Sequence, residues 1–368
     1  MNKVRLLTRK DIEAYVRLIK LGYLEVEAEG IHYGTYLKSR EDLMRWLIKV
    51  PTWGLFNDKG LLIASLSIQF GWNRKDNKNG IIVLKHGVVL SGFKGCGYFS
   101  FLFSWIETNI IKRILRANSL YLETNRCFLK FRDLYLKKFG FYIAKEFKEN
   151  VVVLRKDYTY KYVSKALSFD DTFKFCDLSI RMLTENDSEQ YYNVLREGSK
   201  SSLSEGIDYS FGHFSKEKCY EELIKLPTWG IFGNNGQLVA VASIEFPWQL
   251  TCSNKKRRHV FLRQAAVLKS FYKYLIRTQR MSKYKDNYTY RLFRKNVKFS
   301  FYSMLTDYLM SHYLIEMFKC TVIFTDTAYG SQAMNTQVRD WDMEIVEHIY
   351  TYRSTSHAVV LRRKFVYE

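Results

Sequence analysis

Three glycines and a lysine stand directly before an apolar segment with helical spacing, in the sequence GFKGCGYFSFLFSWIE of residues 92–107. The first backbone N–H groups of a helix lack partners within it, and with the helix dipole they attract anions. Glycines before a helix also occur in tight turns that bind nothing. Here the turn follows an apolar strand and opens an amphipathic helix, which favours a diphosphate site. The residues of this turn are Gly92, Phe93, Lys94, Gly95, Cys96, Gly97 and Tyr98.

The elements that must position this turn occur twice, because the sequence repeats itself at a constant offset of 176 residues. A register that is kept from residue 4 to residue 72 indicates the same structural unit in each half. The matching pairs are VRLLTRKDIEAY (4–15) with IRMLTENDSEQY (180–191), EGIHY (29–33) with EGIDY (205–209), IKVPTWGLF (48–56) with IKLPTWGIF (224–232), and SLSIQFGW (65–72) with VASIEFPW (241–248).

The second copy is longer than the first. VVVLR (151–155) pairs with AVVLR (358–362) at an offset of 207, so the second copy has additional residues, most of them after Phe271. We predict an N-terminal domain of residues 1–165, a linker of residues 166–179, and a C-terminal domain of residues 180–368 with an insertion at 269–299.

Hydrophobic periodicity predicts the same order of elements in each half. A strand over Val4–Leu7 leads through Thr8 into a helix, and a second helix covers Arg40–Lys49. The runs TWGLF, LLIASLSIQF and GIIVLKHGVVL predict an antiparallel meander. The glycine turn follows, then a helix of about residues 98–117, a strand SLYLET, a helix around FRDLYLKKF and a closing hairpin. The expected fold is α/β in the broad sense, an α+β arrangement in which a mixed sheet has helices on both faces. The expected order of elements is βααβββαβαββ.

A second motif lies downstream of the glycine turn, in LETNRCFLKFRDLYLKKFGFY of residues 122–142. With the glycine turn and the order of elements, it makes the chain resemble the GCN5-related N-acetyltransferases, arranged as two tandem domains. The family's turn reads Q/R-x-x-G-x-G/A, and Gly92 here replaces the Gln or Arg, so that Lys94 would have to supply the cation. The family's N-x-x-A-x-x-L-Y-x-K-x-G-F segment is matched, with some shift in spacing, by Asn125, Leu134, Tyr135, Lys137 or Lys138, Gly140 and Phe141.

The resemblance implies an acyl-coenzyme A, acetyl-coenzyme A or another, as the cofactor. Its pantetheine arm would lie along Val88, Val89 and Leu90, and its diphosphate on residues 94–98. An amine would attack the acyl carbonyl, a backbone amide of the fourth strand would stabilise the oxyanion, and Tyr135 would protonate the departing thiolate. Tyr135 can equally be a packing residue, in a chain with 27 tyrosines.

The general base stays open at this point. Glu123 on the fifth strand and His86 on the fourth could both face the cleft, and Gln69 or no base at all are the alternatives. A lone histidine in a strand is often structural. Asn125 completes the set of expected catalytic residues.

The second copy has lost the features of a coenzyme A site. Ser270, Phe271 and Tyr272 stand where the glycine turn should be, and Asp342-Met343 replaces Gly140-Phe141. Without glycines the close approach of the backbone is lost. We therefore expect a degenerate domain that serves binding or packing.

The insertion of residues 269–299 interleaves lysine and arginine with phenylalanine and tyrosine. Cations neutralise phosphates while flat rings stack on exposed bases, so this pattern favours nucleic acid. A solvated loop whose rings pack on the sheet is the alternative. The residues expected to contact nucleic acid, including a basic run just upstream, are Lys255, Lys256, Arg257, Arg258, Lys273, Arg277, Arg280, Lys283, Lys285, Arg291, Arg294, Lys295 and Lys298.

Composition agrees with a polyanionic partner, since the formal net charge is +21. AT-rich coding bias is another source of such a charge.

The six cysteines form no CxxC pair and have no histidine at metal-finger spacing, so we expect a reduced, cytoplasmic protein without a metal site. No sufficiently long apolar window predicts a membrane span, and the N-terminus lacks the apolar core of a signal peptide.

The sequence therefore predicts an acyl-coenzyme A-dependent N-acyltransferase. Its acceptor would be an amine on RNA, on a modified DNA base, or on a protein bound to nucleic acid. One alternative resembles tandem-domain aminoacyl transferases that take the acyl group from a charged tRNA. The other is a non-catalytic, nucleic-acid-binding or inhibitory protein on the same scaffold.

Overall fold

The computed structural model describes two compact units, formed mainly by residues 1–161 and 162–365. The predicted insertion of residues 269–299 and the basic run of residues 255–258 lie outside the described residues. The structure describes residues 2–28, 35, 37–71, 82–147, 151–158, 173–175, 178–203, 209–247, 260–268, 305–306, 308–329, 331, 334–335, 337–338, 342–349 and 358–367.

The first unit is a seven-stranded mixed sheet in the order β1-β2-β3-β4-β5-β7-β6. Every neighbouring pair is antiparallel except β4 and β5, which are parallel. The predicted meander and closing hairpin are thereby confirmed. The strands are β1 (Lys3–Leu6), β2 (Thr52–Phe56), β3 (Leu62–Phe70), β4 (Ile82–Val89), β5 (Ser119–Asn125), β6 (Tyr142–Glu146) and β7 (Val151–Asp157).

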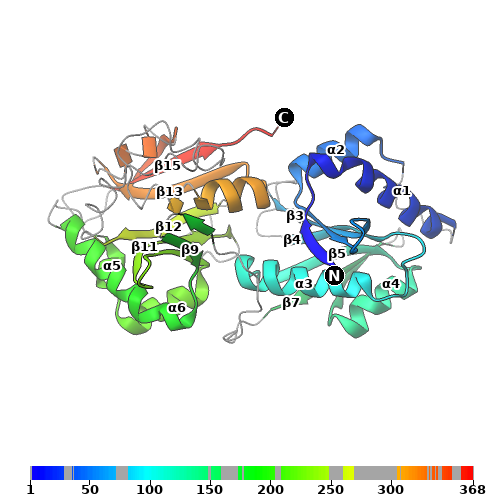
Figure 1. Cartoon of the computed structure of the whole chain (residues 1–368), viewed down its shortest axis with the longest axis horizontal. Coiled ribbons are helices and arrows are strands. Elements are labelled where there is room, and N and C mark those ends of the chain that lie inside the picture. Colours follow the sequence, from blue (N-terminus) through cyan, green and yellow to red (C-terminus); the bar gives the residue numbers. More distant parts are fainter. Residues whose placement is uncertain are drawn as a thin grey trace. The chain divides into compact units, whose positions relative to one another are not determined.

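Helices cover both faces of this sheet, as predicted (Figure 1). A 3-10 turn, Arg9–Asp11, leads into α1 (Ile12–Ala28), which packs with α2 (Arg40–Lys49) on one face. On the other face lie α3 (Tyr98–Ile106), continued by a π-helical segment Glu107–Leu115, and α4 (Leu129–Asp133), continued by a π-helical turn Leu134–Lys138.

Local chemistry explains where these elements begin and turn. The Ser39 hydroxyl accepts a hydrogen bond of 3.0 Å from the backbone N–H of Asp42 and so caps α2. Between β2 and β3, the Asn57 side chain accepts from the backbone N–H groups of Lys59 and Leu61. Gly60 in the same turn has a φ of 75°, a value that glycine adopts without strain.

The second unit repeats this architecture with an eight-stranded sheet in the order β14-β15-β13-β12-β11-β10-β9-β8. Again a single neighbouring pair, β12 and β13, is parallel. The short β8 falls in the range predicted as a linker. The strands are β8 (Phe173–Phe175), β9 (Leu178–Met182), β10 (Thr228–Phe232), β11 (Leu238–Glu245), β12 (Val260–Val267), β13 (Val322–Ala328), β14 (Glu344–Ile349) and β15 (Ala358–Lys364).

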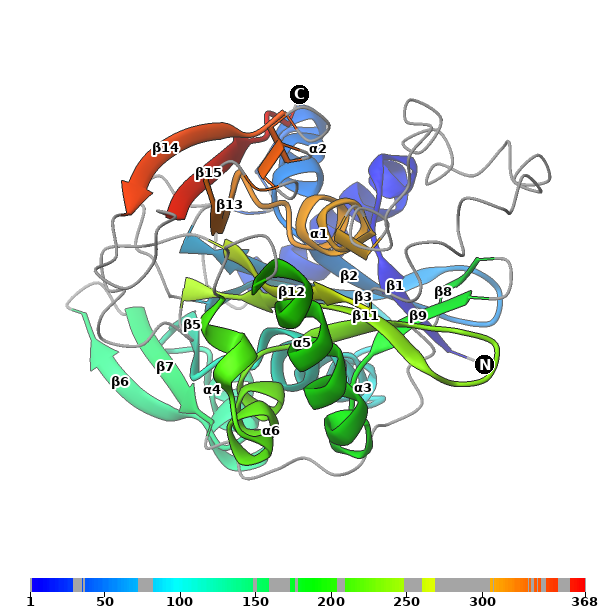
Figure 2. The ribbon, with the colours of Figure 1, turned by 90° about the vertical axis from the view of Figure 1, so that its left-hand side faces the viewer.

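Two helices, α5 (Ser188–Leu203) and α6 (Lys216–Lys225), cover one face of the second sheet (Figure 2). Short 3-10 turns, Glu185–Asp187 and Ser210–His213, precede them. The π-helical segment Leu309–Met317 packs on the sheet through Tyr313, whose ring lies 4.5 Å from that of Trp229. No helix in the described part of the chain is long and apolar enough to cross a membrane.

The turn before the closing hairpin keeps its backbone in the second unit, although its residues have changed. Asp342, which stands in place of Gly140, keeps the left-handed backbone of that position, with φ of 51° against 70°. Met343 then donates to the carbonyl of Gln337 as Phe141 donates to that of Tyr135. The turn is thus preserved in the second unit, with Gln337 at the position of Tyr135.

An Arg–Asp pair, with the carboxylate largely buried, holds the start of the first helix in both units. In the second unit, Arg181 donates to both oxygens of Asp187, at 2.8 and 2.7 Å, and Asp187 also accepts from the Thr184 backbone N–H. Arg5, Asp11 and Thr8 repeat this arrangement. Burial acts to raise the pKa of Asp187, but the hydrogen bonds from Arg181 and Thr184 outweigh it and hold the pKa below its usual value.

We expect Asp187→Asn to destabilise the second unit by about 1–2 kcal/mol at pH 7, because a helix cap and a charged hydrogen-bonded pair are lost. A carboxyl with a depressed folded-state pKa stabilises the protein above its unfolded pKa, and this contribution is lost as the pH falls through the folded value. Urea unfolding at pH 7 and pH 3 measures the difference. Equal loss at both pH values would contradict the assignment to the ionised carboxylate.

Candidate active site

The parallel strands β4 and β5 separate and open a cavity in the first unit. They pair only where Val83 meets Tyr121 and Leu84 meets Leu122. Beyond these pairs, Lys85–Val89 of β4 and Leu122–Asn125 of β5 line a cavity of about 1010 Å³. Strands that diverge leave backbone polar groups of both edges available to a ligand.

A bulge in β4 accompanies this separation. Ser65 pairs with Val88 and Ser67 with Lys85, so that His86 and Gly87 oppose a single residue of β3. His86 accordingly has a φ of 49°, and its carbonyl accepts a hydrogen bond of 3.3 Å from the Ser65 hydroxyl. Bulges bend a strand and redirect its side chains. The histidine is thereby placed on the cavity wall.

The glycine turn lies at the other end of this wall. Gly92, Gly95 and Gly97 all have φ near 80°, and a β-carbon at any of them would meet open space. Gly97 precedes α3, and its carbonyl accepts from the N–H of Phe101. Lys94 and Gly95 line the cavity, and the Lys94 ammonium donates to the Gly22 carbonyl of α1 at 3.3 Å. The turn is therefore open and faces the cavity.

The other residues predicted for the cofactor fall into two groups. Val88 and Val89 line the cavity, whereas Leu90 is buried in the core beside α1. The remaining residues of the turn do not line it, although Phe93 and Tyr98 contact each other with ring centroids 5.9 Å apart. Cys96 is exposed.

His86 is 7% exposed and sits in a network of polar and aromatic groups. Its Nδ1 lies 2.7 Å from the Tyr15 hydroxyl, and its ring stacks on Trp46 with centroids 4.1 Å apart. Its Nε2 lies 3.5 Å from the Lys38 ammonium. Burial, together with the charges of Lys38 and Lys85, holds the pKa of His86 well below its usual value. The imidazole is therefore neutral at pH 7.

The contact with Lys38 favours one tautomer of His86. A charged lysine can only donate, so Nε2 presents its lone pair to Lys38, and Nδ1 carries the proton that is donated to Tyr15. The basic nitrogen of this wall is thus Nε2. Trp46 is held in turn by a hydrogen bond of 3.1 Å from its Nε1 to the Ser67 hydroxyl.

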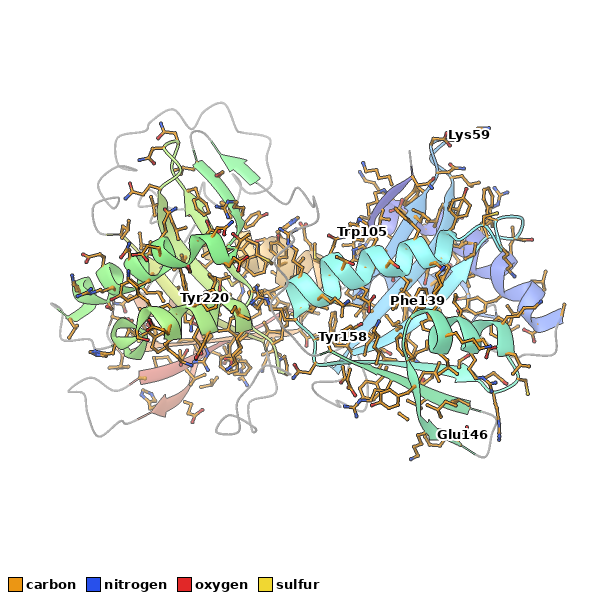
Figure 3. All side chains as sticks on the ribbon, turned by 90° about the horizontal axis from the view of Figure 1, so that it is seen from below. Lys59, Trp105, Phe139, Glu146, Tyr158 and Tyr220 are labelled. Carbon is orange, nitrogen blue, oxygen red and sulfur yellow. The ribbon has the colours of Figure 1, made fainter. Side chains whose placement is uncertain are left out.

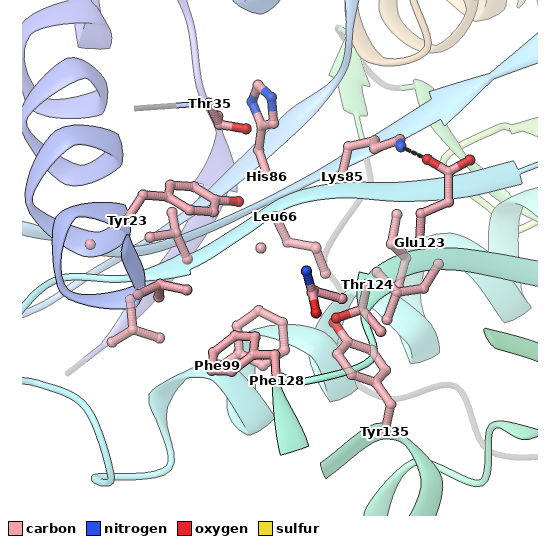
Figure 4. A pocket seen from close by; sticks show the side chains of 18 of the residues that line it. Tyr23, Thr35, Leu66, Lys85, His86, Phe99, Glu123, Thr124, Phe128 and Tyr135 are labelled. Carbon is pink, nitrogen blue, oxygen red and sulfur yellow. Dashed lines mark hydrogen bonds and ion pairs between the residues drawn. The ribbon is translucent and has the colours of Figure 1, made fainter. Parts of the chain in front are cut away.

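Glu123 lines the cavity in an ion pair with Lys85 of the neighbouring strand (Figure 4). The second unit has a corresponding ion pair between neighbouring strands. Arg263 of β12 and Asp326 of β13 occupy the equivalent positions and lie 2.7 Å from each other. There the arginine also bonds Glu245. A pair that persists in the unit without the glycine turn is best explained as a contact that holds the two strands together.

Tyr135 is fully buried and lines the cavity from the turn after α4. Figure 4 shows its hydroxyl pointing into the cavity, which Tyr23 and His86 approach from other sides. Its ring packs edge-on against Phe103 and Phe141, with centroids 5.7 and 5.1 Å apart. Phe139, labelled beside α3 in Figure 3, packs against Phe103 in the same cluster. Tyr135 therefore packs in this aromatic cluster and also lines the cavity.

Asn125 also lines the cavity, and its side-chain oxygen accepts a hydrogen bond of 2.8 Å from the Cys127 backbone N–H. It therefore shapes the turn that follows β5. All four predicted catalytic residues, His86, Glu123, Asn125 and Tyr135, are brought to one cavity.

The sequence interpretation missed the residues that α1, α2 and their connection bring to the site. Tyr23, Thr35, Lys38 and Trp46 line the cavity beside His86. One signal for two of them was present, because Lys38 and Trp46 become Phe214 and Glu222 in a repeat that is otherwise well matched there.

No family model matches the sequence, and no curated protein matches it. Among solved structures, PaiA N-acetyltransferase from Thermoplasma acidophilum in complex with coenzyme A is 15% identical, with 43% of this chain and 99% of that chain covered and a TM-score of 0.37. The chain is similar to acetyltransferases over one domain's length. Ribosomal-protein-alanine N-acetyltransferase from Brucella melitensis is 15% identical over 42% of this chain and 99% of its own, with a TM-score of 0.34. An acetyltransferase from Thermus thermophilus is 15% identical over 43% and 97%, with a TM-score of 0.35.

Proposed function

We propose that the first unit is an acyl-coenzyme A-dependent N-acyltransferase. The observation that carries the proposal is the cavity between β4 and β5, because one wall joins an open glycine turn to a neutral, buried histidine. A diphosphate fits the turn, where glycines leave the backbone uncovered and Lys94 stands at the rim. One of the solved acetyltransferases to which the chain is similar is in complex with coenzyme A.

The chain's own residues suit each requirement of acyl transfer. The bound acyl-coenzyme A would supply a thioester carbonyl for attack by an amine. A backbone N–H of β4 near the bulge would donate to the developing oxyanion. The amine proton would pass to His86, and the buried Tyr135 hydroxyl would donate a proton to the thiolate that leaves.

His86 is the better candidate for the base than Glu123. The contacts to Tyr15 and Lys38 make its Nε2 the basic nitrogen of the ring, on the cavity wall. Glu123 is neutralised by Lys85, and its counterpart pair in the second unit exists where no glycine turn does. An amine that reaches the cavity uncharged needs only a modest base.

The acceptor in this proposal is an amine on nucleic acid or on a molecule bound to it. The support is the net charge of +21 and the basic-aromatic pattern of residues 269–299. The second unit, which lacks the glycine turn, would hold this polyanion while the first performs the transfer.

Isothermal titration of the full chain with acetyl-coenzyme A tests the proposal. We expect saturable binding at one site, with a Kd of about 1–100 μM, and release of free coenzyme A thiol once a suitable amine is added. Absence of binding would overturn the proposal and leave the transfer from a charged tRNA and the non-catalytic hypothesis.

A further inference from the structure

The cavity has an excess of positive charge that acyl-coenzyme A does not fully explain. Among the described residues that line it are four lysines, Lys38, Lys85, Lys94 and Lys130, and a single carboxylate, Glu123. Lys94 belongs to the glycine turn, and Lys85 is paired with Glu123. A site built for a cationic amine would present carboxylates instead.

Lys38 is the cation placed nearest to the proposed chemistry. Its ammonium lies 3.5 Å from His86 Nε2 and 4.8 Å from the centre of the Trp46 ring. In the described part of the chain no carboxylate forms an ion pair with it. Burial lowers its pKa, the charge of Asp42 offsets this only in part, and the charge of Lys85 lowers it further. A half-buried ammonium without a counter-ion is stabilised when a ligand brings an anion.

Comparison with the second unit distinguishes the contacts near His86 that maintain the fold from those that could serve a ligand. Tyr15, Thr52 and Ser67 return as Tyr191, Thr228 and Ser243, and they keep the same hydrogen-bonded pairing of Thr and Ser, 2.7 Å in one unit and 2.8 Å in the other. Lys38 and the two groups around its ammonium, Trp46 and His86, do not return.

In their place the second unit has a different polar network. His86 becomes Gln264, which donates to Glu222 at 3.0 Å, and Glu222 occupies the position of Trp46. Phe214 stands at the position of Lys38. Since the second unit folds with these replacements, Lys38, Trp46 and His86 together are dispensable for the architecture, and their combination is specific to the cavity of the first unit.

The position of Lys38 assigns it to the acceptor rather than to the cofactor. From Gly87 to Leu90, beyond the bulge, the chain spans about 10 Å at the usual rise of a strand, and the glycine turn begins only beyond Leu90. Lys38, which contacts His86, thus lies beside the middle of β4, away from the turn proposed for the diphosphate. A group bound to it would stand beside His86, where the amine must lose its proton.

We propose that the acceptor is an amine that carries an anionic group, a phosphate or a carboxylate, and that Lys38 binds this group so that the amine lies beside His86. The inference rests on the proposed acyl transfer, whose acceptor class it specifies. Trp46 supports the lysine side chain through its ring face, and Lys38 sets the orientation of the substrate.

Pairs of probes that differ in the anionic group test this inference by direct binding. The full chain is titrated with 2-aminoethyl phosphate and ethanolamine, and with glycine and glycinamide, each with and without saturating coenzyme A. We expect at least one anionic probe to bind about 10- to 100-fold more tightly than its uncharged partner. Preference for the phosphate would identify an acceptor that carries a phosphate, and preference for glycine one that carries a carboxylate.

Three variants assign the effect. Lys38→Met keeps the aliphatic stem on Trp46 and should abolish the preference, Lys38→Arg should largely retain it, and Lys130→Met, which removes another lysine of the cavity, should leave it unchanged. Thermal unfolding checks that each variant is folded. The inference is overturned if neither anionic probe binds, if Lys38→Met keeps the preference, or if Lys130→Met loses it equally. Failure to bind acetyl-coenzyme A would instead remove the proposed function, because the probe titrations without coenzyme A do not depend on it.

Discussion

Gly95→Asp is expected to abolish detectable binding of acetyl-coenzyme A, a loss of more than about 100-fold in affinity. Gly95 lines the cavity with a φ of 81°, and a β-carbon there would meet open space. The new carboxylate would therefore stand in the volume proposed for the diphosphate. Like charges repel strongly in a partly buried site, and the backbone N–H groups of the turn would be covered.

Gly60→Asp is a matched control for this experiment. Gly60 also has a left-handed φ, 75°, and a β-carbon added there would likewise meet open space, but it lies in the turn between β2 and β3. Both variants bear a similar backbone strain, about 1–2 kcal/mol, so both should lower the unfolding temperature by a similar amount. Titration calorimetry should separate them completely. Native affinity in Gly95→Asp would show that the cofactor does not use the turn.

The strands and helices of the first unit were predictable because their signals are local. The apolar residues that alternate with polar ones over 64–70, and Ser39 ahead of Arg40–Lys49, are signals that act within a few residues of the element they specify. The internal repeat then supplied a second, independent instance of the same pattern. The glycine turn was predictable for the same reason, since three left-handed positions before a helix leave a direct mark on the sequence.

The composition of the cavity was less accessible to sequence reasoning. Lys38 and Trp46 reach His86 across many residues of intervening chain, through the packing of α2 on the sheet. The pairing of Glu123 with Lys85 depends on the register of two parallel strands, and no local pattern specifies that register. Comparison of the two units shows which cavity residues are specific to the first unit, because it distinguishes contacts present in both units from those present in only one.

That comparison leads to the most informative catalytic variant, His86→Gln. We expect it to lower kcat by about 10²- to 10³-fold, the contribution of a general base, with the affinity for acetyl-coenzyme A almost unchanged. Gln264 stands at this position in the second unit, with a φ of 47° against 49°, and it hydrogen-bonds Tyr191, the counterpart of Tyr15, with the tyrosine as donor. The backbone therefore accommodates glutamine at this position, and thermal unfolding checks that the variant, which has Trp46 in place of the Glu222 partner of Gln264, is folded.

The pH dependence distinguishes a base from a packing residue. Because burial and the neighbouring lysines hold the pKa of His86 well below its usual value, the native enzyme should keep its activity as the pH falls through 6.5 and lose it only in more acidic solution. His86→Gln should lack this acidic limb. A larger loss of kcat in Glu123→Gln than in His86→Gln would instead identify Glu123 as the base. In that case the Lys85–Glu123 pair would have to open before each transfer, and the first unit would use for catalysis a contact that the second unit keeps for its sheet.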